Sequence, residues 1–387
     1  MKIQLLNKIA KIGTDRFPKS FEVSADVSSP DAIMVRSAAM HDMTFGKELL
    51  AIARAGAGVN NIPLDRCAED GIVVFNTPGA NANGVKELAI AALMLASRDI
   101  AGGIAWAKTL PGCEGGVAKA VESGKSRFAG SEILGKTLGV IGLGAIGGLV
   151  ANTARSLGMS VVGCDPYITV HAAWSLSRSV EHAASYDEIY AKSDYITLHV
   201  PSTKDTKGMI NKDTIAKMKD GVRIINLARA DLVDTEALRA ALESGKVASY
   251  VTDFPTEESL TLPNTVNIPH LGASTAESED NCAVMAADEL TDYLMTGNIK
   301  NSVNYPNVSL SHTGAARICV HHRNVPNVLS RITSLVSERG INIENMSNGS
   351  RGNFAYTIVE LGESVAVPDE LAAAIAEIED IIRVRIL

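Results

Sequence analysis

The stretch that decides the fold is GKTLGVIGLGAIGGLVANTARSLGMSVVGCDPY, residues 135–167. A short apolar run over 138–141 leads into a glycine-rich turn, and an Ala- and Leu-rich helical pattern follows as far as Leu157. The spaced glycines of the turn are Gly142, Gly144 and Gly147. Glycines at this spacing allow a tight turn, close approach of backbone N–H groups to a pyrophosphate, and close packing of a helix on a strand. The pattern therefore predicts a dinucleotide-binding βαβ unit.

The segment after the helix strengthens this prediction, because a three-glycine motif alone is weak evidence. A second strand is expected over 160–164, and it ends at Asp165, 18 residues after Gly147 (165 − 147). An acid at this place accepts hydrogen bonds from the adenosine ribose and repels a 2′-phosphate, so the expected cofactor is NAD rather than NADP. Ala145 and Ile146 begin the helix, whose N-terminus is expected to hold the pyrophosphate.

Strands and helices continue to alternate beyond this unit. Strands are expected over 193–203, 223–228 and 248–254, and helices over 214–222 and 234–247. This alternation predicts an α/β fold with a parallel, doubly wound sheet, whose ligands bind beyond the carboxyl ends of the strands. The residues expected there beside the cofactor are His199, Val200, Pro201, Ala228, Asp253 and Gly272.

Three polar residues near expected strand ends suggest a reaction. Arg229 lies between two alanines in RIINLARADLVD, Glu257 lies in DFPTEE, and His270 lies in NIPHLGAST. Oxidation of a 2-hydroxy acid by hydride transfer also requires removal of the hydroxyl proton, for which an imidazole is suited. A neighbouring carboxylate would orient the imidazole, and an arginine would hold the substrate carboxylate in a bidentate fork.

Several motifs together resemble the D-isomer-specific 2-hydroxyacid dehydrogenase family. They are AIARAGAGVNNIPLDRCAEDGIVVFNTPGANANGVKELAIA (51–91), the glycine-rich stretch, INLARADLVDTEAL (225–238), DFPTE (253–257) and PHLGAST (269–275). The resemblance covers nearly the whole chain. It implies that Arg229 binds the substrate carboxylate, that His270 is the acid/base, and that Glu257 is its partner. Ala230 replaces a usual glycine, and the acid motif is one residue shorter than usual, which leaves Glu258 as an alternative to Glu257.

The resemblance also implies a split chain. Residues 1–98 and 285–306 are expected to form a substrate-binding domain, and residues 99–284 the NAD-binding domain, with closure of a hinge excluding water. Two arginines and a glycine-rich loop of the first domain are assigned to the substrate: Arg36, Ser37, Arg54, Ala57, Gly58 and Asn60. The arginines favour a phosphorylated substrate over glyoxylate or lactate. In related dimers a basic residue reaches the neighbouring active site, a role open here to Lys125 or Arg127.

Residues 312–387 show a different pattern, strand–helix–strand–strand–helix–strand. This order resembles an ACT domain, a small ferredoxin-like module that senses amino acids. Positions that hold serine in the resembling dehydrogenases correspond to His322, Asn324 and Asn342, and Asn327 stands where a glycine is usual. Binding of L-serine and a role in association alone both remain open, and either favours a homodimer or homotetramer.

Composition excludes several classes of partner. The net charge of −8 argues against binding to nucleic acid or to an anionic membrane surface. The five cysteines are scattered without metal-ligand spacing, which predicts reduced thiols, a cytoplasmic protein and no metal site. Besides the dehydrogenase, two alternatives remain: a glyoxylate or hydroxypyruvate reductase of the same fold, and an NAD-sensing binding protein of the co-repressor type.

Overall fold

In the computed structural model, which describes residues 1–311, 315–362 and 369–387, the chain crosses twice between two units. Unit 1 contains residues 1–81 and 276–387, and unit 2 contains residues 82–275. These limits differ from the expected boundaries at 98 and 285. Helix α3 packs its buried face into the core of unit 2, and α11 packs into the core of unit 1. The assignment of separate functional domains stays a prediction.

Unit 2 is built on a seven-stranded parallel sheet in the order β12-β11-β10-β9-β6-β7-β8. Its strands are β6 Thr137–Ile141, β7 Ser160–Cys164, β8 Val180–His182, β9 Tyr195–Leu198, β10 Val222–Asn226, β11 Val247–Thr252 and β12 Thr265–Asn267. The chain reverses direction across the sheet between β6 and β9, where doubly wound sheets bind their ligands. The predicted α/β class and parallel sheet are therefore confirmed.

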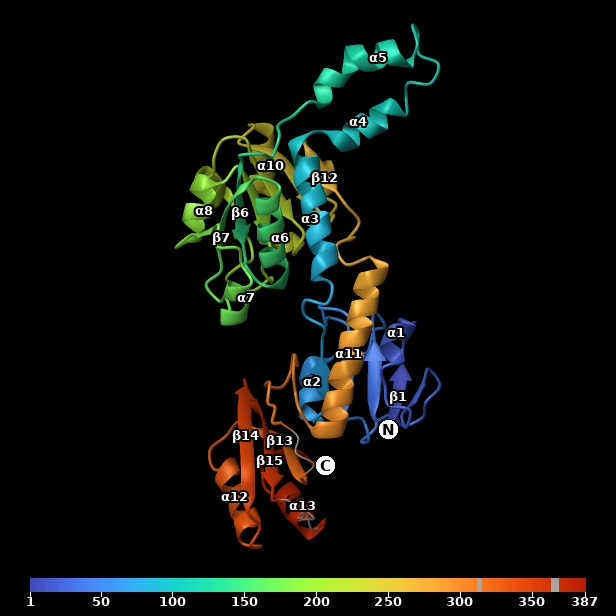
Figure 1. Cartoon of the computed structure of the whole chain (residues 1–387), viewed down its shortest axis with the longest axis vertical. Helices are drawn as coiled ribbons and strands as arrows, with labels where there is room; N and C mark the ends of the chain where they lie inside the picture. Colours follow the sequence, from blue (N-terminus) through green and yellow to red (C-terminus); the bar gives the residue numbers. More distant parts are fainter. Residues whose placement is uncertain (312–314, 363–368) are drawn as a thin grey trace. The chain divides into compact units, whose positions relative to one another are not determined.

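Most helices of unit 2 cover the two faces of this sheet (Figure 1). They are α3 Ala82–Ser97, α6 Ala145–Ser156, α8 Tyr186–Lys192, α9 Lys212–Ala216 and α10 Thr235–Glu243, with short 3₁₀ turns at Ala230–Leu232 and Ser259–Thr261. The short helix α7 Val170–Trp174 buries no side chain. Helix α10 begins at Asp234, whose carboxylate accepts the backbone N–H groups of Glu236 and Ala237 at 3.1 Å. Such N-caps fix where each helix starts and so where the strand-end loops point.

Helices α4 (Ile100–Ala107) and α5 (Val117–Gly124) leave the body of unit 2 as an arm (Figure 1). Both helices lie wholly in the described part of the chain, and neither buries a side chain. The arm ends in the 3₁₀ turn Lys125–Phe128, where Lys125 pairs with Glu122 and the Arg127 guanidinium lies 4.5 Å from the Trp106 ring. These local partners occupy both basic residues.

The first part of unit 1 is a five-stranded parallel sheet in the order β2-β1-β3-β4-β5. The strands are β1 Lys2–Leu5, β2 Glu22–Ser24, β3 Ala32–Val35, β4 Ala51–Arg54 and β5 Val73–Phe75, and the helices are α1 Lys11–Thr14, α2 Leu64–Glu69 and α11 Ala276–Thr296. Helix α11 inserts Ala286 and Leu290, both fully buried, into the core beside β3 and β4. Thus the C-terminal part of the chain completes the N-terminal sheet.

The last part of unit 1 is an antiparallel sheet in the order β14-β15-β13-β16. Its elements are β13 Arg317–Arg323, α12 Val328–Ser337, β14 Ile343–Arg351, β15 Phe354–Leu361, α13 Asp369–Ala376 and β16 Ile381–Ile386. This confirms the predicted strand–helix–strand–strand–helix–strand order. One face of the sheet packs on α12 and α13, and the other lies against the end of α11, where Tyr356 donates to the Gly297 carbonyl at 2.7 Å.

Among the described residues no single helix is both long and apolar enough to cross a membrane. Helices α3 and α4 pass that test only as a pair bent by 73°. Because α3 contributes Ala89 and Leu93 to the core of unit 2, it is a core helix.

Candidate active site and cofactor site

The glycine-rich turn joins β6 to α6 and has the shape that an anion site requires. Gly142 has φ +90° and donates its N–H to the Cys164 carbonyl at 2.9 Å. A Cβ on Gly147 would lie 1.9 Å from the Gly142 carbonyl oxygen, whereas a Cβ on Gly144 meets nothing within 4 Å. Gly144 is the N-cap of α6 and no side chain caps it. The first N–H groups of the helix therefore face open space that a phosphate can fill.

Asp165 holds this turn in place. One carboxylate oxygen accepts the Leu143 N–H and the other accepts the Tyr167 N–H, both at 2.9 Å. Each oxygen has a second lone pair, so the carboxylate can also accept hydrogen bonds from ribose hydroxyls. The Asp165 carboxylate thus connects the turn predicted to bind the pyrophosphate with the position predicted for the ribose.

The segment 199–201 after β9 lies beside the turn. A Cβ on Gly142 would meet the His199 carbonyl oxygen at 2.5 Å and the Val200 side chain at 2.9 Å. His199 Nε2 lies 3.0 Å from the Thr197 hydroxyl, and loss of hydration lowers the pKa of His199 to about 4. The imidazole is therefore neutral at pH 7. The Pro201 carbonyl accepts the Thr206 hydroxyl at 2.6 Å.

Asp253, at the end of β11, is a buried acid with an open hydrogen-bonding position. Its Oδ2 accepts the Gly272 N–H at 3.1 Å, while its Oδ1 has no hydrogen-bond partner among the described residues. Burial raises the pKa of Asp253, opposed by the Gly272 bond and by the positive charges of His270 and Arg229. A buried acceptor of this kind needs a donor, and the carboxamide of a nicotinamide would supply one. The residues present therefore fit NAD.

Arg229 follows β10 in a turn that Asn226 holds. The Asn226 amide nitrogen donates to the Arg229 carbonyl at 2.8 Å, and its oxygen accepts the N–H groups of Ala228 and Arg229 at 3.2 and 3.4 Å. The exposed guanidinium bends back to donate to the Ala228 carbonyl at 2.6 Å. Its remaining N–H groups can hold a carboxylate. Ala230 begins the next 3₁₀ turn, so the usual glycine is not needed there.

His270 lies in a strained turn next to this arginine. Its φ is +45°, and its N–H donates to the carbonyls of Asp253 and Ile268 at 3.0 Å. Both polar side chains lie near the Phe254 ring, whose centroid is 4.5 Å from that of the imidazole and 5.6 Å from the Arg229 guanidinium carbon. A non-glycine residue at positive φ persists only where its surroundings impose it. The structure thus brings Arg229 and His270 together around Phe254.

Glu257 is not joined to His270. No hydrogen bond or ion pair connects the two within the described ranges, and Glu257 is exposed. Bonds from its own backbone N–H and from the Thr256 side chain lower the pKa of Glu258. The acid whose backbone contacts His270 is Asp253, which accepts the His270 N–H through its carbonyl at 3.0 Å. The assignment of Glu257 as partner of the imidazole remains a prediction.

The predicted substrate residues of unit 1 surround the end of β3. Asn7 Oδ1 accepts three backbone N–H groups, from Arg36, Ser37 and Ala38, at 2.9–3.1 Å. The Arg36 guanidinium forms a 2.6 Å ion pair with Glu279 of α11, and both side chains are about half exposed. An anionic ligand of Arg36 would have to compete with this carboxylate.

The neighbouring loop carries the other predicted substrate residues. Arg54 donates from Nε to the Arg36 carbonyl at 3.0 Å and lies over Gly56, where a Cβ would approach its Nη1 to 2.3 Å. The Ala57 carbonyl accepts from Asn76 Nδ2 at 2.6 Å. The Asn60 carbonyl lies 3.0 Å from His41 Nε2. Gly58 lies between these two anchors. The loop is therefore held by its carbonyls, which leaves its N–H groups for a ligand.

The predicted effector residues differ in availability. His322 is buried, its Nε2 lies 2.9 Å from the Thr357 hydroxyl, and its Nδ1 lies 2.8 Å from the Arg323 carbonyl. Asn324 and Asn342 are at the surface, where they donate to Gly352 O and Glu344 Oε1 at 3.1 and 2.9 Å. Asn327 adopts the left-handed conformation with φ +70°, which asparagine tolerates in place of glycine.

Sequence reasoning did not identify Asn7, Asn226 or Phe254 as parts of these sites. A signal existed for Asn226, because it is the one polar residue in the apolar run IINLA, and a buried amide inside a strand must be hydrogen-bonded. Asn7 and Phe254 act only through folded neighbours, so no local pattern marks them.

Comparison with known proteins agrees with this geometry. Residues 93–272 match the family model of the D-isomer specific 2-hydroxyacid dehydrogenase NAD binding domain, and residues 318–384 match the AHAS small subunit-like ACT domain. A D-3-phosphoglycerate dehydrogenase of Bacillus subtilis is 35% identical over 317 residues, which cover 80% of this chain and 57% of that protein. The chain thus spans little more than half the length of this curated relative.

Two solved structures are similar in fold. One is an NAD⁺-bound 3-phosphoglycerate dehydrogenase from Entamoeba histolytica, with a TM-score of 0.61, 28% identity, and coverage of 79% of this chain and 98% of that chain. The other is a glyoxylate reductase from Paecilomyes thermophila, with a TM-score of 0.61, 26% identity, and coverage of 78% and 98%. Residues 93–272 are therefore an NAD-binding domain of the D-isomer specific 2-hydroxyacid dehydrogenase type, and residues 318–384 are an ACT domain.

Proposed function

We propose that this protein is a dehydrogenase that oxidises D-3-phosphoglycerate to 3-phosphohydroxypyruvate with NAD, the entry step of phosphorylated L-serine synthesis. The observation that carries the proposal is that Arg229 and His270 both lie against the Phe254 ring, which follows Asp253 and its open hydrogen-bonding position. The match to a relative of that name, with 35% identity, supports the choice of substrate.

Each residue has one task in the proposed reaction. Arg229 binds the substrate carboxylate through its free N–H groups, and the turn held by Asn226 fixes its position. His270 accepts the proton of the C2 hydroxyl while the C2 hydrogen leaves as hydride. NAD, when bound at the turn that Asp165 holds, would supply the hydride acceptor. In reduction of the ketone, His270 returns the proton to the same oxygen.

The phosphate distinguishes this proposal from its nearest alternative. We assign the phosphate to Arg36 and Arg54, and the carboxylate also to the N–H groups of the loop through Gly58 and Asn60. A glyoxylate or hydroxypyruvate reductase of the same fold would not need these arginines, and the similar glyoxylate reductase structure keeps that alternative open. A binding protein without turnover is less favoured, because it has no use for a polar set arranged around the hydride site.

The test compares three ketoacids in the reductive direction, which is thermodynamically favourable. NADH oxidation is measured with 3-phosphohydroxypyruvate, hydroxypyruvate and glyoxylate, in wild type, Arg36→Ala and the control Arg16→Ala. Arg16 is a good control because it is an equally exposed arginine of unit 1 that also pairs with an acid, Asp288. We expect Arg36→Ala to raise KM about 10- to 100-fold for the phosphorylated substrate alone, the range for a lost charge-assisted contact. Equal rates on all three substrates in wild type would instead identify a general 2-oxo acid reductase.

We further propose that the protein forms a homodimer or homotetramer. The arm of α4 and α5 supports this, because it carries the exposed side chains of Ile104 (54%) and Val117 (49%). A second copy covering the arm would remove this apolar surface from water. Light scattering should then give a dimer or tetramer, and Ile104→Asp should shift it toward the monomer.

L-serine is the effector we propose for the ACT domain, with contacts from the exposed Asn324 and Asn342. His322 is already hydrogen-bonded through both ring nitrogens, so its role would be structural and it would not contact the ligand. Saturable binding of L-serine that weakens in Asn342→Ala would support this assignment. A cytoplasmic location is also proposed, because all five cysteines, each in the described part of the chain, are free thiols.

A further inference from the structure

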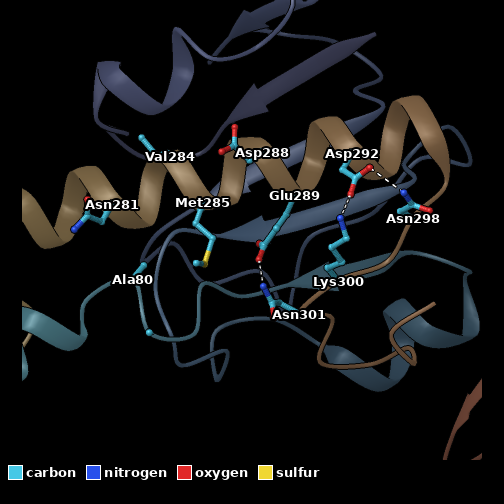
Figure 2. A pocket seen from close by; sticks show the side chains of 11 residues that line it. Ala80, Asn281, Val284, Met285, Asp288, Glu289, Asp292, Asn298, Lys300 and Asn301 are labelled. Atoms are coloured by element: carbon cyan, nitrogen blue, oxygen red, sulfur yellow. Dashed lines mark hydrogen bonds and ion pairs between the residues drawn. The ribbon is translucent and has the colours of Figure 1, made fainter. Parts of the chain in front are cut away.

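Unit 1 contains a pocket of about 540 Å³ that none of the proposed functions uses. One wall is a face of helix α11, and the others are the segments 79–80 and 298–301. Figure 2 shows the side chains that α11 directs into it, with Met285 and Glu289 at its centre. The volume is in the range of sites for small organic molecules.

Two of the three acids that line the pocket already have cationic partners. Asp288 forms a 2.5 Å ion pair with Arg16. Asp292 accepts from Lys300 Nζ at 2.8 Å and from Asn298 Nδ2 at 3.2 Å. Burial opposes the ionisation of Asp292, but the bonds from Lys300 and Thr296 still lower its pKa. These two carboxylates are thus charged and compensated.

Glu289 is different, because it is only 8% exposed and has no cationic partner among the described residues. Its Oε1 accepts from Asn301 Nδ2 at 2.7 Å, and its Oε2 has no hydrogen-bond partner in the described structure. Burial raises the pKa of Glu289 to about 8, against the effect of the Asn301 bond. Figure 2 shows this side chain extending from α11 to Asn301, a residue held at φ +57°. A buried carboxyl oxygen without a partner is costly, so the site calls for a donor.

We propose that this pocket binds a small organic ammonium ion, a primary amine on a short apolar chain, with its nitrogen at Glu289. An ammonium group brings the three N–H donors and the positive charge that Glu289 lacks. The apolar chain would lie against Met285 and Val284, which line the same wall. An anionic ligand is disfavoured by three acids in one lining. The proposal does not depend on which hydroxy acid the enzyme oxidises.

Binding of the cation changes the protonation of one group. In the free protein the raised pKa of about 8 keeps Glu289 mostly protonated at pH 7. A bound ammonium ion stabilises the carboxylate, so the Glu289 proton passes to the buffer and no covalent bond forms or breaks at the ligand. The ionised groups near Glu289 are two ion pairs, Asp288 with Arg16 and Asp292 with Lys300. Both pairs keep their charges. About one proton should therefore be released for each amine bound.

The experiment is calorimetric titration of the full chain with n-butylamine at pH 7, in two buffers of different ionisation enthalpy, phosphate and MOPS. We expect saturable binding, release of about one proton, and at least tenfold weaker binding of the neutral analogue 1-butanol. Glu289→Gln should weaken amine binding at least tenfold and abolish proton release. The control Glu277→Gln changes an exposed residue of the same helix and should have no effect.

Three results would overturn the proposal. They are the absence of saturable amine binding, binding without proton release in the wild type, and unchanged affinity in Glu289→Gln. The proton count in the wild type decides the question even if the variant folds poorly.

Discussion

The side chain of Asn226 is hydrogen-bonded to both backbone polar groups of Arg229, donating to its carbonyl at 2.8 Å and accepting its N–H at 3.4 Å. Asn226 is fully buried at the end of β10, and its amide also donates to the Tyr250 hydroxyl at 3.1 Å. A residue of the core sheet therefore fixes the backbone of an exposed arginine. This connects the stability of the sheet to the position of the proposed carboxylate ligand.

Replacement of Asn226 by alanine should damage catalysis as well as stability. The change leaves the turn without three hydrogen bonds, at a cost of about 1–3 kcal/mol for the buried groups left unsatisfied. We expect kcat for NADH-dependent ketoacid reduction to fall at least tenfold, with little change in the Kd of NADH. The control Asn152→Ala removes another loop-bracing amide, which bonds Ser175 and Ser177, and should lower Tm without this loss of kcat.

Alanine substitutions at two glycines of the cofactor turn should separate folding from binding. Gly147→Ala places a Cβ 1.9 Å from the Gly142 carbonyl, so we expect a lower Tm of the ligand-free protein. Gly144→Ala meets no protein atom within 4 Å, so Tm should stay unchanged while NADH binds at least tenfold more weakly. Thermal unfolding and NADH fluorescence titration measure the two effects. Normal NADH affinity in Gly144→Ala would place the pyrophosphate elsewhere.

Loss of Glu279, the ion-pair partner of Arg36, should strengthen substrate binding, whereas loss of Arg36 should weaken it. Glu279→Gln removes the carboxylate that occupies the guanidinium at 2.6 Å, so a phosphate no longer competes with it. Because exposed pairs are worth less than about 1 kcal/mol, KM for 3-phosphohydroxypyruvate should fall only two- to fivefold. KM for hydroxypyruvate should not change. An equal fall in KM for the two substrates would show that Arg36 does not bind the phosphate.

The sequence predicted the glycine-rich turn, the parallel sheet and the order of the C-terminal elements, because these follow from local spacing and periodicity. It did not predict that α3 packs with unit 2, since an apolar helix can cover either of two neighbouring cores. Nor did it identify Glu289 among the acids of α11. Asp288 and Asp292 look the same in sequence, and only the fold decides which acid receives a cationic partner.

Arg317 should be critical for the attachment of the C-terminal sheet. Its fully buried guanidinium donates to Glu360 at 2.9 Å and to the carbonyls of Thr296 and Ser311 at 2.8 and 2.7 Å. Arg317→Met removes the guanidinium from the buried Glu360 and the donors from two backbone carbonyls, so we expect a loss of about 3–5 kcal/mol in the free energy of unfolding. Adding Glu360→Gln to Arg317→Met should restore part of the lost free energy of unfolding.

A matched control for this change is Arg323→Met on the same strand. Arg323 pairs with Glu69 at 3.8 Å in an exposed position, so its loss should change the free energy of unfolding by less than about 1 kcal/mol. Urea unfolding of the full chain measures all three variants. Equal stability of Arg317→Met and Arg323→Met would contradict the role given to the buried pair.

Glu289 should make stability fall as pH rises. Its pKa is about 8 in the folded protein and near 4.3 in an unfolded chain, so the folded state binds the extra proton between these values. The free energy of unfolding therefore decreases across this window, by at most about 1.4 kcal/mol per pH unit, and levels above pH 8.

Glu289→Gln keeps the acceptor for Asn301 but cannot ionise, so the other titrating groups, Asp288 and Asp292 included, cancel in the comparison with wild type. We expect the stability of the variant relative to wild type to increase from pH 5.5 to pH 8 and then stay constant, measured by urea unfolding at each pH. A difference that does not change with pH would mean that Glu289 remains charged in the folded protein. That result would remove the physical reason for a cation at this pocket to release a proton.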